Sequence, residues 1–270
     1  MQRRQFLTSS LAAGAGVLTG RTGAAPESAR DSAAGKVRQY YELRKYLLRQ
    51  GAETQLTDNY VATALIPALN RMGIAPVGAF NLSIGPETPA LYLLLPCAHL
   101  ETLVNAELRL REDQEFLAAA DAFWNAPAAA PAFQRVESTL LIAFEGWPVL
   151  TLPPPTATKG KRVFQLRTYE SASERDHVRK VKMFHAGEFG IFEKVGFWNV
   201  FFGDALIGSR LPQLTYMLSF ADLKEMDDLW AAFRDDPDWK KLNTVQEFNF
   251  EPIVSNISNL VLMPAGYSQI

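Results

Sequence analysis

The alternation of hydrophobic and polar residues predicts an ordered series of strands and helices. Residues 37–46 alternate between the two kinds of side chain and are rich in tyrosine, which predicts a strand. Residues 54–72 carry apolar side chains at helical spacing, and Gly73 follows as a helix stop. The rest of the first half predicts strands at residues 74–82, 91–95 and 136–144, and a helix over residues 99–124 that is broken near Arg111.

The second half of the chain repeats this order. Its pattern predicts strands at residues 163–169, 197–203, 214–220 and 257–263, helices at 174–195 and 222–233, and a further helical turn after Pro237. Leu43 and Leu166 lie in similar segments, and this offset of 123 residues also aligns other apolar, glycine and arginine positions. Near Ser138 and Ser258 the register slips by three. This ordered set of matches predicts an internal duplication.

The order β-α-β-β-α-β in each half is the ferredoxin-like arrangement, in which both helices cover one face of an antiparallel sheet. We therefore expect an α+β fold of two tandem ferredoxin-like units, residues 36–147 and 163–270, joined by a Pro-rich linker over residues 148–162. The two antiparallel sheets are expected to pack on each other as an α/β-barrel.

Strand alternation divides the side chains of each first strand between two faces. The apolar side chains are expected to meet the helices: Tyr41, Leu43, Phe164 and Leu166. The mixed polar and aromatic set is expected to face the barrel interior: Arg44, Tyr46, Arg167 and Tyr169.

The first 35 residues are expected to be an export signal and leader. Arg3 and Arg4 precede Phe6, Leu7 and a weakly apolar run over residues 11–18, which resembles a twin-arginine signal. That run is shorter than the roughly 20 residues of a membrane-spanning helix. The expected location is periplasmic or secreted, without a stable membrane span. The alternative is a disordered or weakly helical N-terminus.

Composition and charge narrow the function classes. Hydrophobic residues make up 48% of the chain and charged residues 21%, as in soluble globular proteins. The formal net charge of -2 gives no electrostatic footprint for nucleic acid. Cys97 and the three histidines lack the spacing of a zinc site, so no metal is expected. The sequence has no nucleophile elbow, phosphate loop or dinucleotide fingerprint, and leaves the cofactor unknown.

Two short motifs in the second half, Arg167-Thr168-Tyr169 and Asp236-Pro237-Asp238-Trp239, resemble the NIPSNAP family. The resemblance is weaker in the first half, where Lys45 replaces the threonine and residues 112–114 lack the proline and tryptophan. It implies a dimeric α/β-barrel fold and brings no established reaction. The wider superfamily includes heme-degrading monooxygenases, chlorite dismutases and cofactor-free oxygenases, but a shared fold does not fix function.

Arg44 and Arg167 occupy matching strand positions, each two residues before a tyrosine. Such an arginine can hold a carboxylate or enolate through two hydrogen bonds, and Tyr46 and Tyr169 can donate to a ligand oxygen. The structural alternative is an ion pair with Glu42 and ordinary aromatic packing. The second half has the neutral Gln165 where the first has Glu42, so it is the expected anion-binding half.

We expect His185 to act with Arg167 and Tyr169 as the catalytic set, and Trp198 to bind ligand with Arg44 and Tyr46. His185 has the chemistry of a general base or an axial heme ligand. The alternative is a histidine at the edge of the core whose hydrogen bonds are satisfied. His177, among charged neighbours, is expected at the surface.

Two functions follow from this pattern. One is an exported protein that binds a small, mostly apolar or anionic ligand in its barrel, with oxygenase- or lyase-like chemistry as its enzymatic form. The other is a non-catalytic interaction module whose barrel is filled by side chains. The sequence decides neither whether the chain is an enzyme nor whether it binds heme or forms a homo-oligomer.

Overall fold

The computed structural model describes residues 37–249 and 253–270. The expected export signal and leader, residues 1–35, lie outside the described residues. Within the part of the chain that the structure describes, no helix is long and apolar enough to cross a membrane.

The first unit contains four strands and two helical regions in the expected order. Its strands are β1 (Tyr40–Leu47), β2 (Gly78–Ile84), β3 (Ala90–Cys97) and β4 (Arg135–Ala143). The first helical region runs through α1 (Ala52–Tyr60), a π-helical turn η2 (Val61–Leu65) and α2 (Ile66–Arg71). The second is broken into α3 (Leu100–Val104), α4 (Ala106–Leu110) and α5 (Gln114–Trp124), close to the break expected near Arg111.

The second unit has the same order of elements. Its strands are β5 (Val163–Glu170), β6 (Trp198–Ile207), β7 (Gln213–Phe220) and β8 (Asn256–Pro264). Its helical segments are α6 (Glu174–Met183), the π-helical turn η4 (Phe184–Glu188), α7 (Phe189–Val195), α8 (Leu223–Asp235), α9 (Pro237–Asn243) and the 3-10 turn η5 (Gln246–Phe248). Ser173, Asp222 and Asp236 start α6, α8 and α9 by accepting backbone N–H bonds.

The eight strands form one closed barrel in the order β1-β3-β2-β8-β5-β7-β6-β4. Each unit contributes a four-stranded antiparallel sheet, and the sheets join where β2 pairs with β8 and β4 pairs with β6. The expected α+β fold, in which the antiparallel sheets of two ferredoxin-like units form an α/β-barrel, is confirmed, and the two sheets meet edge to edge. Closure pairs the edges of both sheets within a single chain.

The first and third strands pair in the same register in both units. Leu43 pairs with Leu94 and Leu166 pairs with Met217, and both partners differ by the expected 123 residues. In the last strands, Arg44 pairs with Ser138 and Arg167 pairs with Asn259. Those partners lie 121 residues apart, so the slip near the end is two residues rather than three.

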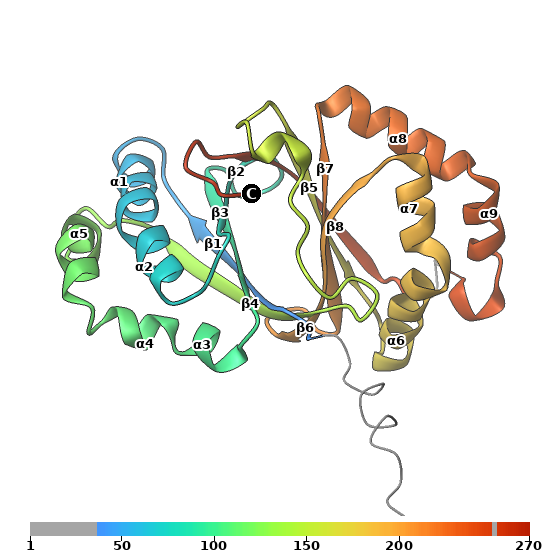
Figure 1. Cartoon of the computed structure of the whole chain (residues 1–270), viewed down its shortest axis with the longest axis horizontal. Helices are drawn as coiled ribbons and strands as arrows, with labels where there is room; N and C mark the ends of the chain where they lie inside the picture. The colour runs from blue at the N-terminus through green and yellow to red at the C-terminus, as the bar shows by residue number, and fades with distance from the viewer. Residues whose placement is uncertain (1–36, 250–252) are drawn as a thin grey trace, which may run out of the picture. The chain divides into compact units, whose positions relative to one another are not determined.

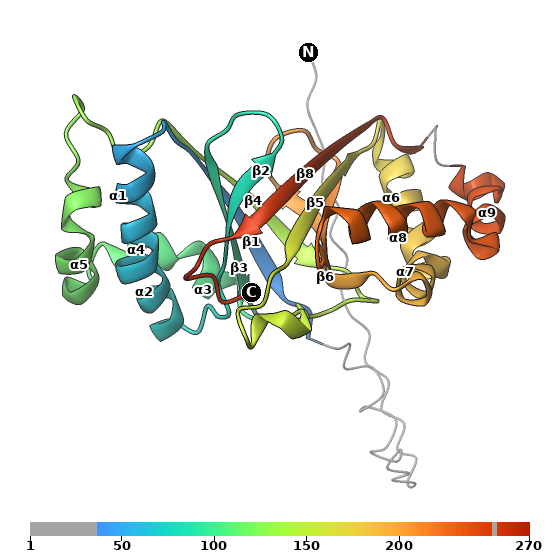
Figure 2. The same ribbon diagram turned by 90° about the horizontal axis from the view of Figure 1, so that it is seen from above.

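The helices lie outside the barrel in two groups, α1–α5 on one side and α6–α9 on the opposite side, as Figures 1 and 2 show. Both helical regions that follow the first strand of a unit contain a π-helical turn at the same relative position, Val61–Leu65 and Phe184–Glu188. Gly73 and Gly196 then end these regions with positive φ angles of 81° and 106°.

The faces of the strands are opposite to the expectation. The side chains expected to meet the helices lie within the barrel core: Tyr41, Phe164, Leu166 and, at its edge, Leu43. Tyr46 and Tyr169 instead pack with helix residues outside the barrel, so Arg44 and Arg167 on the same strand faces also point there. An eight-stranded barrel encloses a space that side chains can fill, and the apolar set fills it.

The Pro-rich segment between the units packs against the strands. The backbone N–H of Gln39 donates to Pro148 O at 2.9 Å, and that of Thr151 donates to Val200 O at 2.9 Å. Leu150 also packs against the barrel core. The segment is therefore anchored to both units along its first residues.

Candidate functional site

Arg44 of the first unit is neutralised by two carboxylates. Its Nε and one terminal nitrogen donate to Glu42 at 2.7 and 3.1 Å, and its other terminal nitrogen donates to Glu107 at 2.5 Å. The side chain is only 5% exposed. Burial alone would lower the pKa of Arg44, but Tyr46, Glu42 and Glu107 raise it well above its ordinary value. The ion pair with Glu42, which was the structural alternative for Arg44, is formed.

Arg167 occupies the equivalent position, but its hydrogen-bonding and stacking partners are the neutral side chains of Tyr169 and Trp230. Among residues 37–249 and 253–270, no carboxylate oxygen lies within ion-pair distance of its guanidinium. One terminal nitrogen donates to the Tyr169 hydroxyl at 3.0 Å, and the guanidinium carbon lies 4.4 Å from the centre of the Trp230 ring. Its Nε is buried and lacks a hydrogen-bond partner within the described ranges. Such an arginine retains hydrogen-bonding capacity for an anion.

Two substitutions between the units explain this difference. Gln165 stands where the first unit has Glu42, and Trp230 stands where it has Glu107, both at the offset of 123 residues. Gln165 accepts a hydrogen bond from the Trp230 indole N–H at 2.6 Å and donates to Asn259 at 2.8 Å. These bonds fix the indole ring beneath Arg167. Sequence reasoning missed Trp230, although the same offset would have found it.

The hydroxyl groups of Tyr169 and Tyr216 continue the polar contacts of Arg167 into the core between the second sheet and its helices. The Tyr169 and Tyr216 hydroxyls are hydrogen-bonded at 2.9 Å. Burial raises the pKa of Tyr216 well above its ordinary value, although nearby Arg167 opposes this. Burial also works against the charged form of Arg167, but Tyr216, Tyr169 and Glu188 raise its pKa above the ordinary value. At neutral pH the site therefore holds a protonated Tyr216 hydroxyl and a charged guanidinium.

A buried ion pair lies at the same site. Lys180 on α6 donates to Glu188 in η4 at 2.6 Å, and the two residues are 0% and 2% exposed. The Lys180 ammonium also lies 5.3 Å from the centre of the Tyr169 ring. The sequence analysis missed both residues. The signal was available, because the first unit has Thr57 and Leu65 at the corresponding positions.

These residues line a cavity of about 430 Å³ between the second sheet and helices α8 and α9. Gln165, Arg167, Tyr169 and Asn259 come from β5 and β8, and Glu188 comes from η4. The helices contribute an apolar and aromatic wall: Met226, Trp230, Phe233 and Trp239. The lining also includes the charged residues Asp227 and Arg234. The Arg167 guanidinium beside the aromatic wall suits an anion that carries an apolar body.

Residues 164–269 match the NIPSNAP family model. The match covers the second unit, which holds the Arg167 cavity. No curated protein matches the chain.

Solved structures resemble the chain across both units. A proposed monooxygenase from Lactobacillus acidophilus NCFM is 8% identical, with a TM-score of 0.55 over 84% of this chain and 94% of that one. Another from Fusobacterium nucleatum subsp. nucleatum ATCC 25586 is 10% identical, with a TM-score of 0.51 over 85% and 93%. An anthrone oxidase-like protein is 9% identical, with a TM-score of 0.50 over 86% and 93%. At these identities the likeness shows the barrel fold alone.

The structure brings together only part of the expected site. Arg167 and Tyr169 line the cavity of the NIPSNAP-matching unit, whereas Arg44 and Tyr46 line a separate cavity of about 450 Å³ in the first unit. Trp198 lies at a third cavity, beside Trp147 and Asn199. The expected grouping of Trp198 with Arg44 and Tyr46 is therefore wrong.

His185 is not part of the Arg167 cavity. Its Nδ1 lies 2.9 Å from the Val181 carbonyl oxygen, and its Nε2 accepts from the Gly146 N–H at 3.1 Å. These bonds assign the proton to Nδ1 and leave Nε2 occupied. His185 therefore fastens the NIPSNAP-matching unit to the end of the first unit, and the structure does not bring it together with Arg167 and Tyr169.

His177 is buried, contrary to the expectation of a surface position. It is 6% exposed, and its Nε2 lies 2.6 Å from Asp204 Oδ1 on β6. The polar neighbours of His177 in the sequence lie on the outer faces of α6, while His177 itself points toward β6. The helical periodicity of α6, rather than the polarity of adjacent residues, determines the burial of His177.

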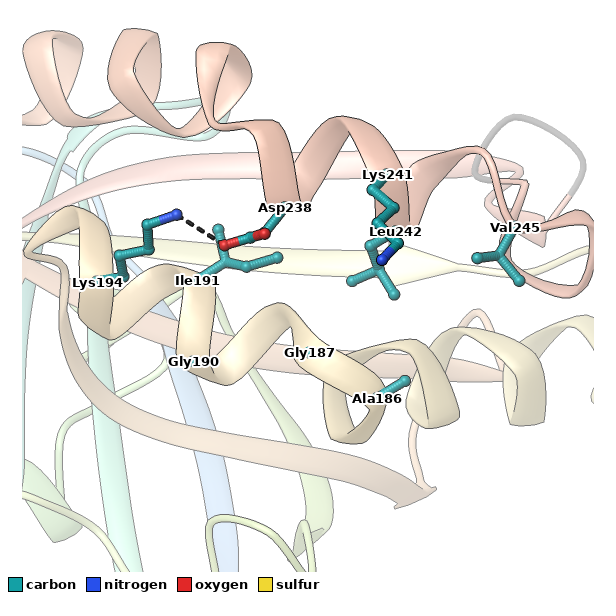
Figure 3. A pocket seen from close by; sticks show the side chains of 9 residues that line it. All are labelled: Ala186, Gly187, Gly190, Ile191, Lys194, Asp238, Lys241, Leu242 and Val245. Carbon is teal, nitrogen blue, oxygen red and sulfur yellow. Dashed lines mark hydrogen bonds and ion pairs between the residues drawn. The ribbon is translucent and has the colours of Figure 1, made fainter.

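A further cavity of about 390 Å³ separates α7 from α9 (Figure 3). One side is formed by small residues of η4 and α7, Ala186, Gly187 and Gly190, and Leu242 lies opposite. Lys194 pairs with Asp238 at 2.7 Å at one end. Because Lys194 is already paired with Asp238, this cavity offers mainly apolar contact to a ligand. It is therefore a weaker candidate for the functional site than the Arg167 cavity.

Proposed function

We propose that the second unit binds a small organic anion with an aromatic or apolar body in the Arg167 cavity. The observation that carries this proposal is the contrast between the two arginines. Arg44 has two carboxylate partners, whereas Arg167 has none within ion-pair distance among the described residues. A ligand carboxylate or enolate would supply the missing anion.

The aromatic wall defines the rest of the ligand. Trp230 stacks on Arg167, while Phe233 packs against Trp230 and Trp239 at ring-centre distances of 5.4 and 4.4 Å. A planar apolar group would bury its surface against these rings. An aryl carboxylate therefore fits the cavity better than an inorganic anion.

An oxygenase- or lyase-like reaction is the enzymatic form of this proposal. Both kinds of reaction can pass through an enolate, and the Arg167 guanidinium and tyrosine hydroxyls are suited to stabilise its oxygen. The shared fold with proposed monooxygenases and an anthrone oxidase-like protein is consistent with this chemistry at the level of fold analogy.

The interaction-module alternative has one observation in its favour. The barrel interior is filled by apolar side chains, as that alternative expects. The Arg167 cavity lies outside the barrel, however, between the sheet and the helices. A filled barrel is therefore compatible with ligand binding in the second unit.

Calorimetric titration tests the proposed binding. Phenylacetate should bind the wild-type chain, whereas benzyl alcohol, which lacks the carboxylate, should bind about tenfold or more weakly. Arg167→Gln should weaken phenylacetate binding by a similar factor, and Arg44→Gln should leave it unchanged. Equal affinity of the wild type and Arg167→Gln for phenylacetate would overturn the proposal.

A further inference from the structure

The Lys180–Glu188 pair distinguishes the helix-side core of the second unit from that of the first. In the first unit the equivalent residues are Thr57 and Leu65, which are both 0% exposed. Thr57 donates its hydroxyl proton to the Ala132 carbonyl oxygen at 2.8 Å. The first unit thus builds the same strand and helix order, including the π-helical turn, with uncharged side chains at these two positions.

This internal comparison argues against a purely structural role. Moving two charges from water into a core is costly, and replacing a buried ion pair with well-packed apolar residues is often neutral or stabilising. The first unit shows that this fold accommodates such residues. π-helical turns also occur frequently at functional sites, and Glu188 is the last residue of one.

The position of Glu188 places a basic group beside the candidate anion site. Glu188 lines the same cavity as Arg167 and Tyr169, and Lys180 holds one of its oxygens at 2.6 Å. A general base must reach the proton it removes, and a base near a bound carbonyl can remove a proton from the adjacent carbon.

We propose that Glu188 is the general base of a proton-transfer reaction on a 2-oxo acid or related carbon acid held by Arg167. This inference rests on the proposed anion binding. The carboxylate of Glu188 takes a proton from the carbon next to the ligand carbonyl, so a C–H bond breaks and an O–H bond forms. The electron pair moves to the carbonyl oxygen, giving an enolate that Arg167 and the tyrosine hydroxyls stabilise.

The step balances without an oxidant or a cofactor. Return of the proton to the same carbon gives hydrogen exchange, and its transfer to the enolate oxygen gives the enol tautomer. Lys180 acts as a positioning residue, because its hydrogen bond fixes the Glu188 carboxylate in the cavity wall. The enolate formed in the first half of this reaction is also the species that oxygenase- or lyase-like chemistry would consume.

Phenylpyruvate is a suitable probe, since it combines a carboxylate, an aromatic ring and an acidic C3–H bond. Proton NMR in D₂O follows the loss of the C3 signal, and calorimetry measures binding separately. The wild-type chain should accelerate exchange at least about a hundredfold over buffer. Glu188→Gln should abolish the acceleration while it retains phenylpyruvate binding, and Arg167→Gln should lose both.

Three further variants separate the role of Glu188 from a loss of folding. Lys180→Thr combined with Glu188→Leu copies the first unit, so it should fold and bind phenylpyruvate without accelerating exchange. Glu107→Gln alters a carboxylate of the first-unit cavity and should exchange at the wild-type rate. Lys180→Met should slow exchange while it retains phenylpyruvate binding, because the Glu188 carboxylate loses the hydrogen bond that positions it.

The possible results separate the two proposals. Phenylpyruvate binding without accelerated exchange, or full acceleration by Glu188→Gln or by the double variant, would overturn the role of Glu188 and leave anion binding intact. Failure of the wild type to bind phenylpyruvate would overturn the proposed function itself and, with it, this inference.

Discussion

At the scale of single residues, charge compensation separates the two equivalent arginines. Arg44 pairs with both Glu42 and Glu107, so removal of its guanidinium would leave two neighbouring carboxylates facing each other without a cation. Arg167 is held mainly by its contacts with Trp230 and Tyr169. The Arg44 pairing followed from the sequence, since Glu42 lies two residues away on the same strand face. Glu107, Lys180 and Glu188 lie on other elements, so their contacts required the fold.

Arg44→Ala should therefore destabilise the chain far more than Arg167→Ala. We expect the free energy of unfolding to fall by about 3 kcal/mol for Arg44→Ala, because a buried ion-pair network loses its cation. Arg167→Ala should lose about 1 kcal/mol, mainly from stacking on Trp230. Urea unfolding followed by circular dichroism measures both. Equal losses would show that the two arginines have the same structural role.

At the scale of elements, the order of strands and helices was predictable from the sequence, but the strand face that meets the helices was not. Alternation separates the faces of β1 and β5 without showing which face meets the helices, and both faces carry aromatic residues. The assignment depends on barrel closure, which sends Tyr41 and Phe164 inward. The ends of the helical regions at Gly73 and Gly196 were easier to predict, since both glycines adopt the left-handed conformation that glycine favours.

Replacing either of these glycines with alanine should strain the helix end. We expect Gly73→Ala and Gly196→Ala each to lower the free energy of unfolding by about 1 kcal/mol. Gly190→Ala is the matched control, because this glycine lies within α7 and an added Cβ would meet no atom within 4 Å. It should be neutral or slightly stabilising. Thermal unfolding of the three variants tests the difference, and equal effects at Gly196 and Gly190 would contradict it.

At the scale of the whole molecule, edge pairing between the units makes the chain one closed barrel. The duplication remains a prediction from the sequence, and the shared register of β1–β3 and β5–β7 agrees with it. Apolar side chains pack the barrel core, and a cavity of about 100 Å³ beside Leu43 and Leu166 is lined partly by polar side chains. The larger Arg167 cavity lies outside the barrel, between the sheet and the helices.

Burial of tyrosines throughout this fold predicts alkaline unfolding. Burial raises the pKa of Tyr41, Tyr60 and Tyr216 above the ordinary value of about 10. Folded and unfolded chains both keep these protons below that pH. Above it only the unfolded chain loses them, so stability falls as pH rises. Phenolate absorbance should appear together with loss of circular dichroism. Titration of all eight tyrosines near pH 10 without unfolding would contradict this account.

Export is a separate property that residues 1–35 are proposed to carry. Replacing Arg3 and Arg4 with lysine should keep the precursor in the cytoplasm, because the twin-arginine route reads that pair. Cell fractionation followed by immunoblotting measures the distribution. Undiminished periplasmic delivery of the double variant would remove the twin-arginine assignment and leave the folded units unaffected.

The central claim is that Arg167, which has no carboxylate within ion-pair distance among the described residues, is available to an anion. Gln165→Glu tests it most directly, because it restores the acid that the first unit carries at Glu42 and keeps an acceptor for the Trp230 indole. Calorimetry with phenylacetate should show binding to the wild type and affinity weaker by about tenfold or more in Gln165→Glu. Unchanged phenylacetate affinity in this variant would contradict the account.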